Sequence, residues 1–335
     1  MLFRSLLLGP WLGMEGFSWG VLAGAVVGNF AIQFWSAKRL GMQLHFRFNV
    51  KHPDLIKYVL LTLPLMVGLS MTFSTEFFLK FFGSFLPDGS IAAMNYAFRV
   101  TLMLVGFFGQ AVGVATFPFM ARLVAEDKLK EMNRLLNDTL RYLSLVIPVS
   151  ALLIVLRTEV IRILFERGKF DSAATVITAE ALAFMLIGAF AFAAQTVVVR
   201  GYYAQQNTLF PALFGSIAVV LSIPAYIAGM QMMGINGVAL AISFSAIFQV
   251  LLLYVVWNRR TRNPGCFRVY RSYIKMAILS LPLAVFLNWF KSAVFPESWN
   301  TELWGCLLIS AVIGAIFSGL LAISGAVFKI NEIQE

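Results

Sequence analysis

Charged and amide side chains interrupt the long apolar runs of this sequence at a few positions. In the run over 91–120 they are Asn95, Arg99 and Gln110. On a regular α-helix, Asn95 lies about 40° and Gln110 about 20° from Arg99 around the axis, so the three share one face. A guanidinium group there can bind two phosphate oxygens at once. The spacing predicts that Arg99 faces a water-filled cavity for an anionic substrate, with Asn95 and Gln110 as further binding residues. The alternative is a salt bridge that serves only the packing of a helix bundle.

Three more ionisable residues occupy predicted membrane segments. Glu76 and Lys80, in the run over 55–86, are four residues apart with the acid first, the order that favours an ion pair on a helix. They either neutralise each other or, with Glu180 in the run over 173–199, act as coupling residues that exchange partners with Arg99 and a proton or cation. For Glu180 a structural role is the stronger interpretation.

The composition places these residues in a membrane. The 335 residues are 60% hydrophobic and 13% charged, whereas soluble domains carry about 25% charged residues. A membrane-spanning helix needs about 20 apolar residues, so the sequence predicts an all-α polytopic membrane protein with about nine transmembrane helices. Long continuous runs disfavour a β-barrel, whose strands alternate over about ten residues. The predicted helices cover 17–36, 55–86, 91–120, 137–160, 173–199, 209–232, 234–257, 272–290 and 303–328.

Several of these runs contain a proline. Proline removes a backbone hydrogen bond and crowds the carbonyl group four residues before it, so it kinks or breaks a helix. Such kinks are therefore expected at Pro64, Pro118, Pro148 and Pro224.

Other classes of function lack their motifs. No G-x-x-x-x-G-K-[ST], G-x-S-x-G or H-E-x-x-H pattern occurs, so we expect neither an ATP-driven pump nor an enzyme, and no cofactor. Cys266 and Cys306 have no histidine near them in the sequence, so no metal site is expected. We attribute the net charge of +10 to basic residues in loops that contact anionic lipid headgroups. The expected partners therefore include membrane lipids and exclude nucleic acid.

Basic residues are distributed unequally over the two sets of alternate connectors. The set formed by 37–54, 121–136, 200–208, 258–271 and the C-terminal tail holds fifteen Lys and Arg, and the other set holds five. By the positive-inside rule the first set is cytoplasmic, which places the C-terminus inside and residue 1 outside. A start outside without a signal peptide predicts a chain that lacks an N-terminal group of helices.

Four segments match a known pattern in combination. They are GSIAAMNYAFRV (89–100), FPFMARL (117–123), ILFERGKFD (163–171) and VVRGYYAQQNTLFP (198–211). Together and in this spacing they resemble the MurJ/MviN family of lipid II flippases, and the resemblance extends over essentially the whole chain. No single segment would be specific by itself.

The resemblance implies the fold of the multidrug/oligosaccharidyl-lipid/polysaccharide exporter superfamily. In that fold two six-helix lobes surround a cavity, and two further helices form a groove for a lipid tail. The chain would hold helices six to fourteen of fourteen, in three parts. Residues 1–54 would end the first lobe and add a cytoplasmic linker, residues 55–257 would form the second lobe, and residues 258–335 would add a basic loop and the two groove helices. The remainder of the first lobe then becomes an expected partner.

The resemblance also bears on single residues. The family's cavity arginine in a Tyr-Ala-x-Arg segment falls on Arg99, although Phe98 stands where some relatives have Asp. The sodium site proposed for some members would fall on Leu79 and Tyr226. Neither side chain carries a carboxylate or an amide, which puts a site of that type in doubt.

The residues and the resemblance together predict a flippase of the bacterial inner membrane. It would move lipid II, an undecaprenyl-diphosphate-linked peptidoglycan precursor, from the cytoplasmic to the outer leaflet by alternating access during cell-wall biogenesis. The substrate partner is thus a lipid-diphosphate-linked sugar-peptide. One alternative is an exporter of another lipid-linked oligosaccharide, of the O-antigen type, and another is a drug or cation antiporter of the same fold. A third is a non-transporting membrane scaffold, in which Glu76 or Glu180 pairs with Arg99.

Overall fold

The computed structural model describes residues 15, 19–42, 52–72, 74–296, 299 and 302–328. These residues form helices joined by short turns, and internal packing divides the chain into two units, Met1–Lys57 and Tyr58–Glu335. In the first unit a continuous helix covers Trp19–Arg39 and includes the π-helical segment η2 (Val26–Ala31) and α2 (Ile32–Arg39). The division between the units falls within α3 (Pro53–Thr72).

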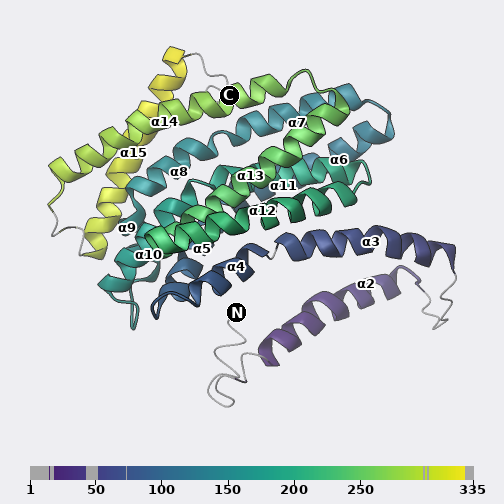
Figure 1. Cartoon of the computed structure of the whole chain (residues 1–335), viewed down its shortest axis with the longest axis horizontal. Helices are drawn as coiled ribbons and strands as arrows, with labels where there is room; N and C mark the ends of the chain where they lie inside the picture. Colours follow the sequence, from purple (N-terminus) through teal and green to yellow (C-terminus); the bar gives the residue numbers. More distant parts are fainter. Residues whose placement is uncertain are drawn as a thin grey trace. The chain divides into compact units, whose positions relative to one another are not determined.

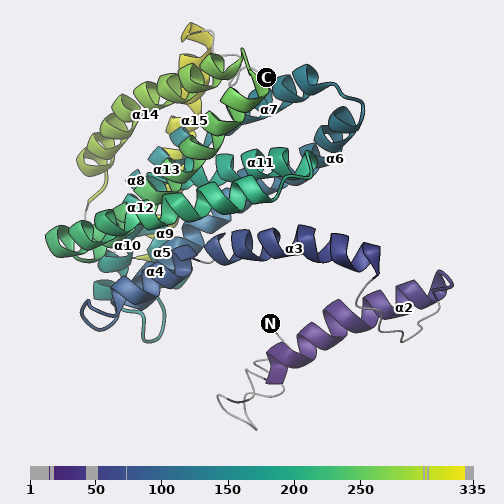
Figure 2. The ribbon, with the colours of Figure 1, turned by 45° about the vertical axis from the view of Figure 1, so that its right-hand side comes forward.

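The second unit is a bundle of long helices (Figure 1). In chain order they are α4 (Ser74–Gly83), α5 (Ser90–Val105), η3 (Gly106–Gln110), α6 (Ala111–Ala125), α7 (Leu129–Leu143), α8 (Val146–Val155), α9 (Arg157–Phe165), α10 (Ser172–Leu186), α11 (Ala189–Ala204), α12 (Leu209–Met233), α13 (Ile235–Thr261), α14 (Cys266–Val294) and α15 (Leu303–Phe328). Helices α12 and α13 pack side by side, α10 packs on α5, and α11 packs on α13 (Figure 2). Helix α14 lies along α7 and α8, and α15 contacts α9 and α14.

The predicted all-α polytopic membrane class is confirmed. Among the described residues, seven helices are long and apolar enough to cross a membrane, or eight if the bent pair α10–α11 counts as one span. The predicted run over 55–86 corresponds to α3 and α4, and Phe73 between them lies outside the described residues. Four of the cations counted for orientation, Arg4, Arg47, Lys51 and Lys329, also lie outside them.

The segment 121–136, expected as a polar connector, is mostly helical, and that expectation is wrong. Helix α6 continues to Ala125, and α7 begins at Leu129. The reason is an apolar period of four residues, in which Met132, Leu136 and Leu140 lie buried on one face of α7 while charged residues occupy the other. The charged residues on the other face lower the mean hydropathy of the segment, so hydropathy alone does not reveal this period.

The four prolines at which kinks are expected differ in their effect on the helices. A turn at Ser144 and Leu145 separates α7 from α8, four and three residues before Pro148, as expected from the clash between the proline ring and the Ser144 carbonyl group. Pro118 and Pro224, by contrast, stay inside the continuous helices α6 and α12. Helix α3 likewise continues through Pro64.

The bend between α10 and α11 has its own support. The two helices meet at 47°, and buried Ser243 on α13 bonds to both sides of the break. Its Oγ donates toward the Phe184 and Met185 carbonyl oxygens at 2.7 and 3.1 Å and accepts from the Gly188 N–H at 3.1 Å. A Cβ at position 188 would lie 2.6 Å from Ser243 Cα, so glycine permits this approach. The freed backbone groups are therefore satisfied inside the bundle, as a membrane requires.

Three buried apolar clusters hold the second unit together. The first joins α4, α5, α10 and α13, and the second joins α7, α11 and α13. The third joins the end of α8 and the start of α9 to α14 and α15 through Leu156, Leu287, Ile309 and Ile313. Because lipid tails are as apolar as these side chains, the stabilisation comes from close packing.

Candidate functional site

Arg99 lies on α5 about 14 Å along the helix from Ser90. Its side chain is exposed, and it forms no hydrogen bond or ion pair with any residue that the structure describes. Within that part of the chain, neither Glu76 nor Glu180 pairs with it. A guanidinium group inside a membrane segment is costly unless water or an anion contacts it. The arrangement therefore leaves all five Arg99 donors available to a ligand.

Asn95 and Gln110, predicted on the face of Arg99, are held differently. Half-buried Asn95 donates from Nδ2 to the Ile91 carbonyl oxygen at 2.8 Å, one turn earlier on α5. Gln110 is exposed and ends the π-helical segment η3. A π turn changes the rotation between Arg99 and Gln110, which the regular-helix calculation did not include.

Gln110 contacts a cation that sequence analysis had placed elsewhere. Arg200 was counted in the connector 200–208, but it lies within α11, and its Nη2 donates to Gln110 Oε1 at 2.7 Å. A Cβ at Gly113 would overlap the Arg200 guanidinium group, and Arg200 Nη1 is buried with no hydrogen-bond partner among the described residues. Gly109 likewise permits close packing, since its Cβ would lie 2.7 Å from Ala193 Cα. The glycines of this segment were the sequence signal for such an approach.

The proposed coupling residues do not form one cluster with Arg99. Glu76 and Lys80 are both exposed on α4, and no ion pair joins them in the part of the chain that the structure describes. Glu180 is exposed on α10, and its Oε2 accepts from Asn236 Nδ2 at 3.0 Å. That bond ties α10 to the first turn of α13, as a structural role would require.

The two positions aligned with the family's sodium site serve packing. Leu79 and Tyr226 are both buried in the first apolar cluster, at 0% and 1% exposure. The Tyr226 ring stacks on Phe82 with centroids 5.1 Å apart. Among the described residues no group of three His, Cys, Asp or Glu could hold a metal ion.

A buried ion pair joins α9 to α14, and sequence analysis missed it. Glu159 is 0% exposed on α9, and Lys291 Nζ on α14 donates to its two carboxylate oxygens at 2.8 and 3.1 Å. The same ammonium group donates to the Val155 carbonyl oxygen at 2.9 Å, at the C-terminus of α8. A cation is favourable at that end of a helix. Lys291 had been read as a loop cation at a helix end.

A second ion pair closes the loop after α9. Arg162 Nε and Thr175 Oγ1 both donate to Glu166 Oε2 at 2.7 Å. Partial burial opposes ionisation of Glu166, but the hydrogen bonds from Arg162 and then Thr175 outweigh it and lower the pKa of this carboxyl. Asp171 caps α10 by accepting from the Ala174 N–H at 2.8 Å. The loop is thus fixed at both ends.

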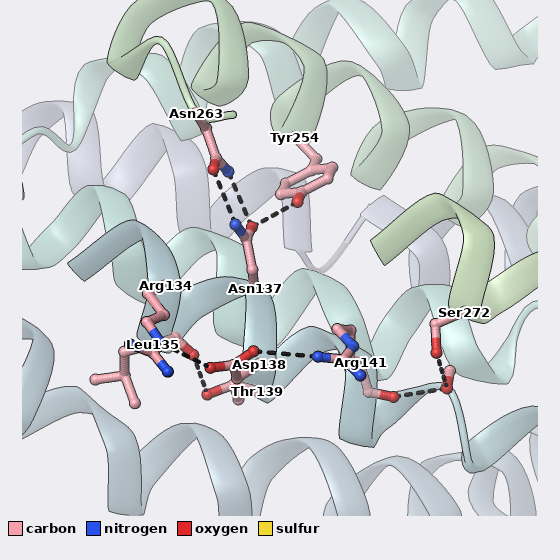
Figure 3. A network of polar contacts seen from close by, with 10 residues as sticks. Arg134, Leu135, Asn137, Asp138, Thr139, Arg141, Tyr254, Asn263 and Ser272 are labelled. Carbon is pink, nitrogen blue, oxygen red and sulfur yellow. Dashed lines mark hydrogen bonds and ion pairs between the residues drawn. The ribbon is translucent and has the colours of Figure 1, made fainter. Parts of the chain in front are cut away.

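A hydrogen-bonded amide cluster joins α7, α13 and the start of α14 (Figure 3). Asn137 and Asn263 exchange hydrogen bonds of 2.8 and 2.9 Å, and Tyr254 donates to Asn137 Oδ1 at 2.8 Å. Asn263 also donates to Asn258 Oδ1 at 2.8 Å and accepts from the Gly265 N–H at 3.1 Å. The side-chain oxygen and nitrogen atoms of Asn137 and Asn263 thus each have at least one hydrogen-bond partner. They fix the connection between α13 and α14 against α7.

The turn between α6 and α7 carries a solvent-exposed ion cluster. Lys128 Nζ and Arg122 Nε each donate to Glu126 at 2.8 Å. These bonds, that from Lys128 first, lower the pKa of Glu126 to about 2. Glu126 in turn raises the pKa of Lys128. The cluster is ionised throughout the physiological range.

An apolar groove of about 500 Å³ lies between the α8–α9 junction and α14. Its lining includes Ile154, Ala284, Val285 and Trp289. The groove is adjacent to the Glu159–Lys291 pair, because Val155 belongs to its lining and accepts from Lys291. Arg157, Asn288 and Ser292 complete the lining, so both apolar and polar side chains contribute to it.

Comparison with known proteins gives a consistent result over most of the chain. The profile of the family described as "Lipid II flippase MurJ" matches residues 2–309. A probable lipid II flippase MurJ of Rhizobium meliloti (strain 1021) is 28% identical over 317 residues, which cover 92% of this chain and 59% of the relative. Lipid II flippase MurJ of Burkholderia cenocepacia is 24% identical over 92% of this chain and 61% of its own. The chain thus spans about three-fifths of the length of these curated relatives.

Solved structures agree with this result. The structure titled "Lipid II flippase MurJ, inward closed conformation" matches 95% of this chain and 64% of its own, with a TM-score of 0.67 and 25% identity. An outward-facing multidrug resistance transporter of the MATE family, in the MOP superfamily, matches 82% of this chain with a TM-score of 0.51 and 17% identity. The second likeness concerns the fold alone.

Proposed function

Because the chain belongs to the lipid II flippase MurJ family, we propose that it forms part of a flippase for a lipid-diphosphate-linked sugar-peptide. The activity is transport and not catalysis, and the chain supplies the part of the transporter that matches residues 2–309 of the family profile. The substrate is lipid II, which moves from the cytoplasmic to the outer leaflet of a bacterial inner membrane. The basic connectors then face the cytoplasm, as does the C-terminus.

Arg99 is the observation that carries the proposal at the level of residues. It is an exposed cation within a membrane span, and no described residue neutralises it. In a water-filled cavity its planar guanidinium group would bind two oxygens of the substrate diphosphate. A drug antiporter for cations would instead need an exposed carboxylate in this place. Asn95 and Gln110 are secondary binding residues, and Gln110 orients Arg200 toward the same helix.

The lipid tail remains in the membrane while the headgroup crosses. The apolar groove between the α8–α9 junction and α14 supports this division of roles. Alternating access would move the lobes around the cavity, with Glu76, Lys80 and Glu180 as candidate coupling residues. We propose the membrane potential as the driving force, because moving one charge through 100 mV is worth about 2.3 kcal/mol.

Complementation tests the proposal. The chain is fused to the first part of the Rhizobium relative, which it does not match, and expressed in bacteria depleted of their own lipid II flippase. We expect growth with Arg99 and loss of growth with Arg99→Ala at equal membrane levels. Lys169→Ala is the control, because it removes one exposed cation from a loop outside the proposed cavity.

Each outcome separates the alternatives. If the fusion with Arg99 and the Arg99→Ala fusion both restore growth, the assignment as a flippase stands and Arg99 has no part in its mechanism. Failure of the folded, inserted Arg99 fusion would contradict the lipid II assignment. Rescue of a strain that lacks an O-antigen-type exporter, but not of the lipid II flippase strain, would identify another lipid-linked oligosaccharide as the substrate. A scaffold would rescue neither strain.

A further inference from the structure

An open cavity of about 1360 Å³ lies beside the amide cluster of Asn137 and Asn263. It is formed by the α6–α7 turn, residues of α7 from Leu129 to Tyr142 and the connection of α13 to α14. These two connectors, near 126–128 and 262–265, are far apart in the sequence, and their basic residues predict the same cytoplasmic side for both. The structure brings them together around one space, which is large enough for a phosphate-bearing headgroup.

The cavity carries an excess of positive charge. Its lining contains six cations, Lys128, Lys130, Arg134, Arg141, Arg262 and Arg268, against three acids, Asp127, Glu131 and Asp138. Lys128 is held by Glu126 at 2.8 Å, and Asp138 lies 3.4 Å from Arg141 and 3.9 Å from Arg134.

Three of the six cations remain without an acidic partner. Lys130, Arg262 and Arg268 are exposed, and none of them forms an ion pair with a residue that the structure describes. Lys130 comes from α7, Arg262 from the end of α13, and Arg268 from the first turn of α14. A single anion between them would add a polar bridge between three elements that already pack on one another through buried apolar side chains and the amide cluster.

The wall that carries these cations is pre-formed. Arg262 has a left-handed backbone with φ of 49°, and the following Asn263 is held by Asn137, Asn258 and the Gly265 N–H. A Cβ at Gly265 would lie 2.6 Å from Asn137 Nδ2, so the connection packs tightly on α7. The backbone that carries Arg262 is thus fixed before a ligand binds, and binding has to order only the exposed cationic side chains.

Two helix N-termini add to the positive potential. Lys128 and Gly265 begin α7 and α14, neither helix has a side-chain cap, and residues of both first turns line the cavity. Free N–H groups and the helix dipoles favour an anion at such ends. Both helices are membrane spans that start here, so the cavity lies at the depth of lipid headgroups.

We propose that this cavity binds the phosphate headgroup of an anionic phospholipid in the leaflet at which α7 and α14 begin. The phosphate bridges Lys130 to Arg262 and Arg268 and so holds α14 against α7. This site is separate from Arg99, and it does not depend on the substrate of transport.

Native mass spectrometry of the purified full chain tests the proposal with three probes: phosphatidylglycerol, phosphatidylcholine and inorganic pyrophosphate. We expect phosphatidylglycerol to bind at least tenfold more tightly than phosphatidylcholine. The variant Lys130→Gln/Arg262→Gln/Arg268→Gln should lose about a hundredfold in affinity, since each cation near the surface contributes about fivefold. The matched control Arg259→Gln/Arg271→Gln/Lys275→Gln removes the same charge from exposed neighbours that do not line the cavity. It should bind as the wild type does.

Single substitutions keep the test valid if the triple variant does not fold. Arg268→Gln should weaken phosphatidylglycerol binding about fivefold and Arg271→Gln should not. Equal losses in the two triple variants, or no preference over phosphatidylcholine, would overturn the site. Tight binding of pyrophosphate without binding of phosphatidylglycerol would overturn the lipid assignment and identify a soluble phosphate compound as the ligand.

Discussion

Two regions of the second unit carry ionised groups in or beside its candidate membrane spans, and they differ in how those groups are compensated. At the junction of α8, α9 and α14, Lys291 supplies both a carboxylate and a helix C-terminus with hydrogen bonds. On α5, Arg99 has no such partner among the described residues. The difference separates groups that hold the fold from groups available to a ligand. Hydropathy does not separate charged residues that hold the fold from charged residues that are available to a ligand. Only the partners in the structure distinguish them.

The largest effect on the unfolding free energy is expected for the Glu159–Lys291 pair, in which each charge has a partner of opposite sign. Lys291→Met leaves the Glu159 carboxylate buried without a cation, and should cost about 3–5 kcal/mol of unfolding free energy. Thermal unfolding of the purified protein measures this loss. Replacing both residues, in Glu159→Leu/Lys291→Met, should restore most of it. Lys275→Met, an exposed position on the same helix, is the control, and an equal loss there would contradict the assignment.

The amide cluster is the next test. Asn137→Ala removes the acceptor of Tyr254 and two of the four side-chain hydrogen bonds of Asn263, which should cost about 1–3 kcal/mol. Hydrogen exchange should rise over 262–265, because the connection loses its attachment to α7. Asn288→Ala, an exposed amide on α14, should change neither quantity. Unchanged exchange in Asn137→Ala would mean that the connection is held by other contacts.

The pH dependence of the loop after α9 should be smaller. The pKa of Glu166 is lowered in the folded protein from its ordinary value of 4.5. A lowered carboxyl pKa contributes stability that is present above the unfolded value and lost as the pH falls through the folded value. Unfolding free energy should therefore drop by about 1 kcal/mol below pH 4.5, and Glu166→Gln should remove that part of the drop. An identical pH profile for Glu166→Gln and Asp88→Asn would refute this role.

The smallest effect on stability is expected at Arg99. Because no described residue depends on its charge, Arg99→Gln should change the unfolding free energy by less than about 0.5 kcal/mol. The same variant should abolish complementation, which separates ligand binding from folding. A loss of stability comparable with that of Lys291→Met would place Arg99 among the structural ion pairs instead.

The sequence predicted the class of fold well because long apolar runs identify membrane helices. Among the four prolines at which kinks were expected, Pro148 follows a break at Ser144 and Leu145, whereas Pro64, Pro118 and Pro224 lie in continuous helices. No feature of the sequence predicted the break at Leu156, which no proline or glycine marks. The start of α7 was missed, because charged residues on one face obscured the buried period on the other.

Single positions were easier to find than their partners. Arg99 was noticed because an arginine in an apolar run is rare, whereas Glu159 and Lys291 are separated by 132 residues and neither predicts the other. Gln110 was assigned to the face of Arg99 by a regular helix, and the π-helical segment η3 changes the rotation on which that assignment rests. Arg200 was missed because it stands near the end of its apolar run and was read as a loop residue.

The separation of Glu159 and Lys291 has a consequence for biogenesis. Glu159 leaves the ribosome 132 residues before the lysine that neutralises it, which at the usual rate of synthesis is roughly 7 to 26 seconds. During that interval the insertion machinery handles a segment whose carboxylate has no cation. We therefore expect the α8–α9 segment to remain bound to the translocon or to an insertase until α14 has been synthesised.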